Sequence, residues 1–442
     1  MKTHVIEFPQ KSQKQFFLVI LTLIVLTVIP LYLFDNPSLL HQKNPSPATF
    51  LSDNITTFSF SATNNSIEAT KKLDEEDVVS EDFSETMLVK KCDLFKGEWI
   101  PSPEGPYYTN ETCGEIYDHQ NCLKFGKPDT GFLKWRWKPY DCELPRFSPS
   151  SFLKIVKGKS MAFVGDSMSR NQLQSLLCLL SSVPVEVSYL PDGKTKRWLY
   201  TNYNFTIVFF WSPHLVKTIE DDRPKGPLLF PLVNVYVDEF DDTWTNQIHR
   251  FDYVIISAAQ WFWRPSVFYE NGQVVGCFDC KDNNITDLTL FYGYKRAFKT
   301  AFRAFNQNFK GMTFLRSYSP GHFDNGAWNE GGTCTRTRPY TSNETKLEGF
   351  GQQFYLTQLE EFMAAAQGDG KKRGLKFRLL DTTQAMLLRP DGHPGRYGYP
   401  PEEKRTTSDC VHWCLPGPTD TWNELLLHML KMESERPSDV KD

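Results

Sequence analysis

The sequence predicts an α/β domain with a parallel central sheet covered by helices on both faces, preceded by a small disulfide-stapled N-terminal lobe. After Phe152, short strand-like runs alternate with segments of helical periodicity, and several of these runs are continuously apolar, as in strands buried on both faces. Between Cys92 and Pro149 the chain instead has four cysteines, many turn residues and few long periodic segments. With 442 residues, the chain can bury one large core or two modest ones.

The first 90 residues divide into a tail, an apolar segment and a polar stem. Residues 16–34 form an almost uninterrupted apolar run of 19 residues, which is long enough to cross a bilayer. Three lysines and one glutamate precede it, so the positive-inside rule places tail 1–15 in the cytosol. Residues 35–90 are rich in Ser, Thr, Asn and acids and predict a flexible lumenal stem. We expect a single-pass type II membrane protein. A cleaved signal peptide is less consistent with the length of the run and with the lack of small residues after it.

Cysteines and glycosylation sequons indicate that the rest of the chain lies in a secretory lumen. The even number of cysteines allows five disulfides whose connectivity cannot be read from the sequence. All ten follow the stem: Cys92, Cys113, Cys122, Cys142, Cys178, Cys277, Cys280, Cys334, Cys410 and Cys414. The sequons begin at Asn54, Asn64, Asn110, Asn204, Asn284 and Asn343.

Two cysteine pairs, Cys277 with Cys280 and Cys410 with Cys414, have part of the spacing of a zinc site. No second ligand pair accompanies either one, so disulfides are the favoured interpretation and we predict no metal.

The lobe, residues 91–149, is rich in aromatic residues. In an extended stretch, Trp135 and Trp137 would present both indoles on one face and Arg136 on the other. Such a pair can stack on sugar rings, but packing over the disulfides is the favoured alternative.

Residues 150–434 are predicted to form the catalytic domain, followed by a short tail at 435–442. Strands are expected at 160–164, 205–211, 253–257, 313–317 and 377–381. Helices are expected at 169–180, 291–309, 353–366 and 422–432. Ligands of such sheets bind beyond the carboxyl ends of the strands.

Ser167 occupies that edge, at the junction between a buried strand and a helix. Gly165 and Asp166 are turn residues, and the apolar residues after Ser167 recur at helical spacing. The first N–H groups of a helix have no partner within it, so a hydroxyl there lies beside donors for a developing oxyanion. Ser167 is therefore a candidate nucleophile; the alternative is an ordinary turn with an N-capping serine.

A base and its carboxylate occur far downstream, where Asp409 precedes His412 by three residues. A serine hydroxyl becomes nucleophilic when a base takes its proton, and a carboxylate fixes the tautomer of that base. Alone, the pair is equally consistent with a surface pair or half of a metal site. The two flanking cysteines are expected to hold this segment against a neighbour.

The segments GDSMSRNQ and DCVHWCLPGPTDTWNELL together resemble the paired signatures of the plant trichome birefringence-like family. The resemblance extends from about Lys91, through CDLFKGEWIPSPEGPYYTNETC and DTGFLKWRWKPYDCELPRF, to about Met432. It implies an SGNH/GDSL-hydrolase-like three-layer α/β/α fold and the activity of a Golgi polysaccharide O-acetyltransferase. It also implies the roles of nucleophile for Ser167, general base for His412 and orienting acid for Asp409.

Further residues are candidates for stabilising the oxyanion or contacting the donor. We expect Asn171 to donate to the oxyanion, Arg170 to hold an acid or orient the donor, and Asp166 to brace the turn; the alternative for the first two is an ordinary helix surface. Related hydrolases use a Gly-x-Asn block for part of the oxyanion hole, and this chain has no clear equivalent. The candidate set is Gly165, Asp166, Arg170, Asn171 and Gln260.

Of the candidate substrate contacts, Trp261, Trp263 and His322 follow other strands at the same edge. Many relatives have Gly-His-Trp-Trp where this chain has Gln260 before two tryptophans, a departure that resembles the xyloglucan-acetylating branch. The tryptophans are candidate sugar platforms, or else an aromatic rim packed on the sheet. His393 is a candidate for lining an acceptor groove. The predicted substrate-binding set is Trp261, Trp263, His322 and Trp413.

The sequence as a whole predicts a Golgi O-acetyltransferase that acts on a wall polysaccharide, with xyloglucan side chains as the favoured acceptor. A net charge of −4 argues against a nucleic-acid partner, and Gly-rich loops of the Walker or Rossmann type are absent. We expect no bound cofactor, and an acetyl donor that is either acetyl-CoA or an acetylated intermediate supplied by a membrane protein. The alternatives are xylan or mannan as acceptor, an acetylesterase, and a non-catalytic wall-glycan binding protein.

Overall fold

The structure is a computed structural model that describes residues 92–220, 231–307, 309–403 and 407–436. The predicted tail, membrane anchor and stem, with Asn54 and Asn64, lie outside these residues. Within the described ranges, no helix has the length and apolar character needed to cross a membrane.

A seven-stranded sheet forms the centre of the described chain, in the order β13-β12-β9-β3-β6-β5-β4. Five parallel strands confirm the predicted ones, with bounds that shift by at most one residue. They are β3 (Ser160–Gly165), β6 (Phe205–Trp211), β9 (Tyr253–Ser257), β12 (Met312–Arg316) and β13 (Lys376–Leu380).

The central strands are parallel, as predicted, but one edge of the sheet is antiparallel. There β4 (Glu186–Tyr189) and β5 (Lys196–Tyr200) form an antiparallel hairpin, and β5 is antiparallel to β6. A tight turn can join antiparallel neighbours, whereas parallel strands need a long crossover. The short polar connection between β4 and β5 therefore permits only the antiparallel arrangement.

A second, four-stranded sheet was not predicted. Its order is β11-β10-β8-β7, from β7 (Val216–Glu220), β8 (Val233–Phe240), β10 (Ser266–Glu270) and β11 (Gln273–Phe278). Along β8, Val233, Val235 and Val237 are buried, while the residues between them are partly exposed. This is the period-two pattern of a half-buried strand. The buried face packs against α5 (Leu290–Ala304).

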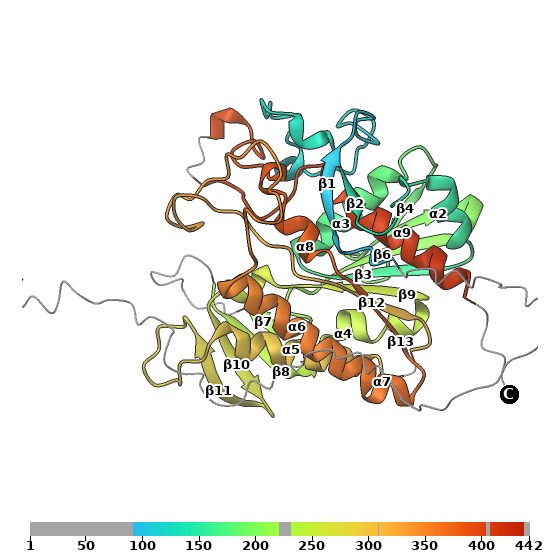
Figure 1. Cartoon of the computed structure of the whole chain (residues 1–442). Coiled ribbons are helices and arrows are strands. Elements are labelled where there is room, and N and C mark those ends of the chain that lie inside the picture. Colours follow the sequence, from blue (N-terminus) through green and yellow to red (C-terminus); the bar gives the residue numbers. More distant parts are fainter. Residues whose placement is uncertain (1–91, 221–230, 308, 404–406, 437–442) are drawn as a thin grey trace, which may run out of the picture. The chain divides into compact units, whose positions relative to one another are not determined.

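Helices cover both faces of the central sheet, which gives the three predicted layers (Figure 1). One face carries α2 (Pro149–Ile155), α3 (Ser167–Leu179) and α9 (Asp420–Ser434). The other face carries α4 (Asp242–Thr245), α5, α6 (Gly349–Gln367) and α7 (Asp369–Lys372); α8 (Thr383–Leu387) follows β13. Short 3₁₀ turns are η4 (Thr201–Tyr203), η5 (Ile248–Arg250), η6 (Gln260–Trp263), η7 (Pro390–Gly392) and η8 (Pro401–Glu403).

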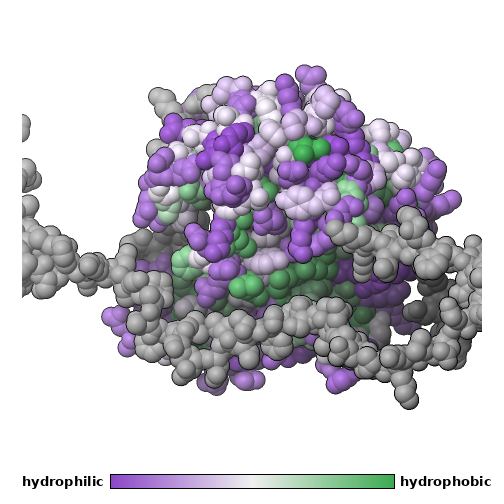
Figure 2. All heavy atoms as spheres, in the orientation of Figure 1, coloured by the Kyte–Doolittle hydropathy of each residue, from purple (hydrophilic) through white to green (hydrophobic). Residues whose placement is uncertain are grey.

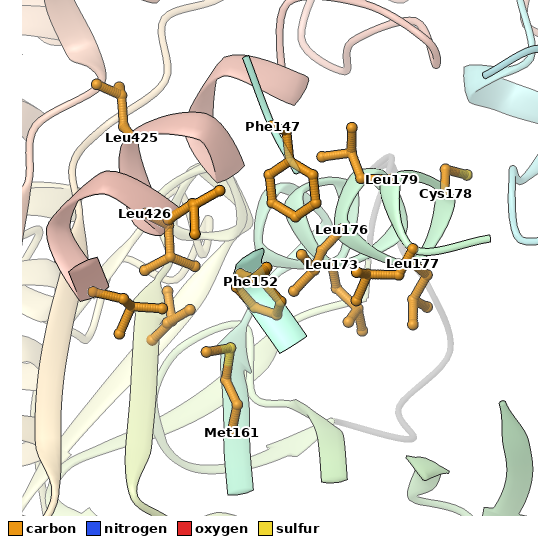
Figure 3. Close-up of a cluster of buried hydrophobic side chains, with 14 of the residues drawn as sticks. Phe147, Phe152, Met161, Leu173, Leu176, Leu177, Cys178, Leu179, Leu425 and Leu426 are labelled. Carbon is orange, nitrogen blue, oxygen red and sulfur yellow. The ribbon is translucent and has the colours of Figure 1, made fainter. Parts of the chain in front are cut away.

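Helix α3 is fixed by the core on its side of the sheet. Figure 3 shows leucines of α3 gathered with Phe152 and Met161 and facing Leu425 and Leu426 of α9. Burial of each such side chain contributes about 1.5–3 kcal/mol. In the orientation of Figure 1, apolar residues form a band across the lower half of the molecule (Figure 2), where α6 lies. The exposed apolar side chains of α6 are Phe350, Leu356 and Met363.

Most disulfides of the N-terminal lobe join it to the catalytic domain. Its regular elements are β1 (Gly97–Pro101), antiparallel to β2 (Trp135–Pro139), with η2 (Asp118–Gln120) and η3 (Gly131–Leu133). Only Cys92–Cys142 closes within the lobe, whereas Cys113–Cys178 and Cys122–Cys414 lead outward. The lobe is stapled by disulfides, as predicted, and two of these three bonds join it to the catalytic domain.

The last two disulfides lie outside the lobe. Cys277–Cys280 and Cys334–Cys410 complete the pairing of all ten cysteines, so neither partial zinc spacing holds a metal. Trp137 is buried and packs edge-on against Trp99 at 5.7 Å, which favours packing over sugar binding. Three described sequons are exposed, at Asn204, Asn284 and Asn343, and Asn110 is half-buried.

Candidate active site

The nucleophile candidate is placed by a short turn between β3 and α3. Asp166 caps the helix, because one carboxylate oxygen accepts from the N–H of Met168 at 2.9 Å. Its second oxygen accepts from the N–H groups of Ala259 and Gln260, at 2.9 and 3.2 Å. Asp166 therefore joins the two neighbouring loops, and Ser167 is the first residue of α3, only 7% exposed.

Gly165 allows β3 and β9 to approach each other at this turn. It has a φ of +148°, and a Cβ at this position would lie 1.8 Å from the carbonyl oxygen of Ser257. Only glycine fits such a contact without displacing the backbone. The role that the structure assigns to Gly165 is therefore steric.

His412 and Asp409 form the predicted base and acid pair. Nδ1 of His412 lies 2.8 Å from Oδ2 of Asp409, whose Oδ1 accepts from the backbone N–H groups of Val411 and His412. Burial opposes a charge on His412, but the adjacent Asp409 carboxylate outweighs it and raises the pKa of His412. Burial likewise opposes ionisation of Asp409, yet His412 and the backbone donors lower the pKa of this carboxyl. Nε2 of His412 is buried and has no hydrogen-bond partner among the described residues.

Helix α3 connects the two halves of the site. Asn171, one turn after Ser167, accepts from the N–H of Trp413 at 2.9 Å and donates to its carbonyl at 3.4 Å. The charges of Asp166 and Arg170, which flank Ser167 in the chain, both act on His412. Helix α3 thus begins with Ser167 and, one turn later, binds the loop that carries His412.

The His412 loop, residues 409–415, has no regular secondary structure and depends on distant partners. Cys410 and Cys414, two residues on either side of His412, are bonded to Cys334 and Cys122. Backbone hydrogen bonds pair Asp409 with Gly395 and run from Cys414 to Gly392, from His322 to Cys410 and from Leu415 to Gln120. The flanking cysteines therefore hold the loop against neighbours, as predicted.

His119, on η2 of the lobe, was not predicted to lie at the site. Its ring packs edge-on against His412 with 5.1 Å between centroids. Burial and the nearby His412 lower the pKa of His119 to about 4. Nothing in the local sequence of the lobe signals this contact, because it joins segments far apart in the chain, which the disulfide Cys122–Cys414 and a backbone hydrogen bond from Leu415 to Gln120 also link.

Arg170 lies between two aromatic faces beside a hollow of about 530 Å³. Its guanidinium is 5.2 Å from the ring centroids of both Tyr117 and Trp211. It forms no ion pair with any described carboxylate, and its Nε is buried without a partner. The hollow is also lined by Tyr189, and these three aromatic residues are among the more exposed in the described chain.

Of the residues after β9, Gln260 and Trp261 contact other parts of the protein, whereas Trp263 is exposed. The amide of Gln260 donates to the carbonyl of Ser319 at 3.1 Å, and Trp261 packs against Trp211 and under Arg264. Trp263 is 38% exposed and lines a second hollow of about 810 Å³. Of the two predicted platforms, Trp263 is therefore the more open to solvent.

Three predicted substrate contacts are instead internal. Trp413 is fully buried, donates to the hydroxyl of Ser319 at 2.9 Å and stacks on His393 at 4.0 Å. His393 is also fully buried, so it cannot line a groove. Both ring nitrogens of His322 contact protein atoms, which leaves neither for a substrate. The sequence could not show that the fold covers these three residues.

A serine at a strand-to-helix turn, together with a hydrogen-bonded histidine and aspartate pair, supplies the groups that serine esterases use. The model of the GDSL/SGNH-like acyl-esterase family found in Pmr5 and Cas1p matches residues 144–429, and the chain belongs to this family. The model of the PMR5 N-terminal domain matches residues 90–143.

Similar proteins narrow the class further, to the trichome birefringence-like group. Trichome birefringence-like 19 of Arabidopsis thaliana is 50% identical over 98% of this chain and 96% of its own. Xyloglucan O-acetyltransferase 1 of the same plant is 38% identical over 93% of this chain and 96% of its own. Xyloglucan O-acetyltransferase 4 of Populus trichocarpa is 42% identical over 77% of this chain and 81% of its own. The chain is an acetyltransferase of this group.

Proposed function

We propose that this protein transfers acetyl to hydroxyls of xyloglucan side chains by way of an acetyl ester on Ser167. The observation that best supports this proposal is the state of His412: Asp409 holds its Nδ1, while Nε2 has no hydrogen-bond partner in the described part of the chain. Donation from Nδ1 leaves the lone pair on Nε2, which is the atom that a general base needs. The choice of xyloglucan is supported by the similarity of the chain to two xyloglucan O-acetyltransferases.

The proposed reaction has two halves. First, His412 takes the proton of Ser167 as Oγ attacks the acetyl carbonyl; the leaving group then departs with that proton and acetyl-Ser167 remains. The N–H of Ser167 at the start of α3 and the nearby guanidinium of Arg170 are the oxyanion donors we propose. Second, a sugar hydroxyl gives its proton to His412 and attacks the acetyl carbon, and Ser167 recovers the proton as it leaves.

The hollow beside Arg170 supports a carbohydrate acceptor. Tyr117, Tyr189 and Trp211 expose 43%, 60% and 40% of their surface there, and such rings can stack on sugar faces. Aromatic walls would also limit access of water to the acetyl-serine. The donor that we propose is acetyl-CoA or an acetylated intermediate passed on by a membrane protein.

We also propose that the enzyme is a single-pass type II protein of the Golgi membrane with a lumenal catalytic domain. The apolar run 16–34 supports an anchor. Five disulfides and three exposed sequons support an oxidising, glycosylating compartment around the domain.

An acetylesterase is a second candidate, because the matching family is described as one of acyl-esterases.

One experiment distinguishes the candidates. The full-length chain should be expressed in a glycosylating host. Microsomes from this host should then be incubated with an acetyl donor, either acetyl-CoA or p-nitrophenyl acetate, and with xyloglucan, xylan or mannan oligosaccharides in separate reactions. Mass spectrometry then measures acetyl gained or lost. We expect gain on xyloglucan that disappears in Ser167→Ala. Acetyl gained on xylan or mannan instead would identify a different acceptor. Acetyl lost from acetylated oligosaccharides, without any gain, would indicate the esterase. Glycan binding without either reaction would leave a non-catalytic binding protein.

A further inference from the structure

Two histidines form a chain of contacts that ends on the backbone of the His412 loop. Nδ1 of His322 is 2.7 Å from Nε2 of His393. The outer nitrogens each face a carbonyl oxygen: Nε2 of His322 lies 2.9 Å from that of Leu387, and Nδ1 of His393 lies 2.7 Å from that of His412. From the described residues, no other hydrogen bond reaches the carbonyl of His412.

The number of protons limits what this chain can hold. A carbonyl oxygen only accepts, so each outer nitrogen needs a proton, and the 2.7 Å contact between the inner nitrogens needs one as well. Three protons on two rings make one imidazole and one imidazolium. A neutral pair carries only two protons. It can therefore keep the hydrogen bond between the rings and a hydrogen bond to just one of the two carbonyl oxygens.

The surroundings favour the neutral pair. Burial lowers the pKa of His393 and lowers that of His322 to about 4. Nearby carboxylates oppose this effect: Asp324 and Asp391 raise the pKa of His322, and Asp409 raises that of His393. Lys127, which donates to the carbonyl of His393 at 3.0 Å, lowers the pKa of His393 further. Asp391 is already paired with the buried Arg389 at 2.8 Å. In the neutral pair, the link to His412 therefore depends on which nitrogen of His393 carries the proton.

We propose that His393, supported by His322, is a positioning residue for the general base: its Nδ1–H holds the carbonyl of His412 and thereby fixes the ring of His412 against Ser167. Stacking of His393 on the buried Trp413 orients this donor, because the two rings lie 4.0 Å apart and nearly parallel. Neither histidine contacts substrate. The effect on catalysis rests on the function proposed above, whereas the chain of hydrogen bonds does not.

Two substitutions separate positioning from general structural support. In His393→Asn, the amide nitrogen can take the place of Nδ1 and keep the bond to His412, whereas in His393→Gln it takes the place of Nε2 and loses that bond. We expect the full-length Asn variant to keep kcat within about threefold of the parent. The Gln variant should lose roughly tenfold to a hundredfold in kcat with KM nearly unchanged, since this is a change in transition-state stabilisation.

The pH profile and the melting temperature complete the test. Asp409 raises the pKa of His412, so a displaced His412 should move the acid limb of kcat to lower pH in the Gln variant only. Equal losses in the two variants with equal melting temperatures, or a change confined to KM, would overturn the proposal.

A second measurement keeps the two proposals distinguishable. Nuclear magnetic resonance of the full-length chain with ¹⁵N-labelled histidine should show a strongly downfield N–H proton shared by the two rings, absent in His393→Asn. If acetyl transfer fails while this signal is present, the proposed function is wrong and the hydrogen-bonded pair stands. Absence of the signal in the parent would refute the pair itself.

Discussion

The two halves of the candidate site are held in different ways. The turn at Ser167 is built from contiguous residues, where β3 runs directly into α3 and the core fixes both elements. The His412 loop has no helix or strand and depends on the lobe, α3 and two other loops. The comparison shows that neighbouring residues of one strand and one helix can position one half of such a site, while disulfides and hydrogen bonds to distant residues position the other half.

Removing the nucleophile should give the largest effect. In Ser167→Ala we expect acetyl transfer to fall by at least about a thousandfold, because no other group can carry the acetyl. The melting temperature should stay near that of the parent, since Asp166 and Gly165 still hold the turn. Transfer that persists in this variant, measured by mass spectrometry, would mean that another residue is the nucleophile.

Removing the carboxylate tests the His412 half chemically. In Asp409→Asn, we expect kcat to fall roughly a thousandfold or more, because the amide no longer fixes the tautomer of His412. Asp409 raises the pKa of His412, so its loss should move the acid limb of kcat/KM to lower pH. An unchanged acid limb would show that His412 is not the group that titrates.

Cutting a cross-link of the loop tests its dependence on distant partners. Cys122–Cys414 joins residues 292 positions apart, whereas Cys277–Cys280 spans three. From chain entropy, we expect the Cys122→Ala/Cys414→Ala variant to lose roughly 2–5 kcal/mol of unfolding free energy and also activity. The matched Cys277→Ala/Cys280→Ala variant should lose roughly 1–2 kcal/mol and keep its kcat. Equal effects on kcat would contradict the comparison.

Two buried asparagines test whether a single hydrogen bond from α3 to the His412 loop matters for catalysis. Asn171 binds the backbone of Trp413, whereas Asn423 on α9 donates to Gln172 and Ser175, away from the loop. Replacing either residue with alanine should cost about 1–3 kcal/mol, since a buried polar group loses its partner. Only Asn171→Ala should also lower kcat, by roughly tenfold. A similar loss of kcat in Asn423→Ala would show that α3 as a whole, and not its bond to the loop, positions His412.

Sequence patterns predicted the parallel strands and the long helices because their periodicity is local and strong. They missed the β4–β5 hairpin and the second sheet, although β8 carries a clear alternation. Irregular segments were the least predictable. His322, His393 and Trp413 were expected to contact substrate, but they are covered because three loops pack together around them.

The sequence by itself determined the order of the main strands and helices, the strand-to-helix position of Ser167, and the proximity in the chain of Asp409 to His412. These features depend on neighbouring residues, whose spacing sets periodicity and turns. Only the tertiary structure decided the disulfide partners, the approach of His119 to His412, and the contact of His393 with the carbonyl of His412. Such contacts join residues far apart in the chain, and they form only when the whole core has packed.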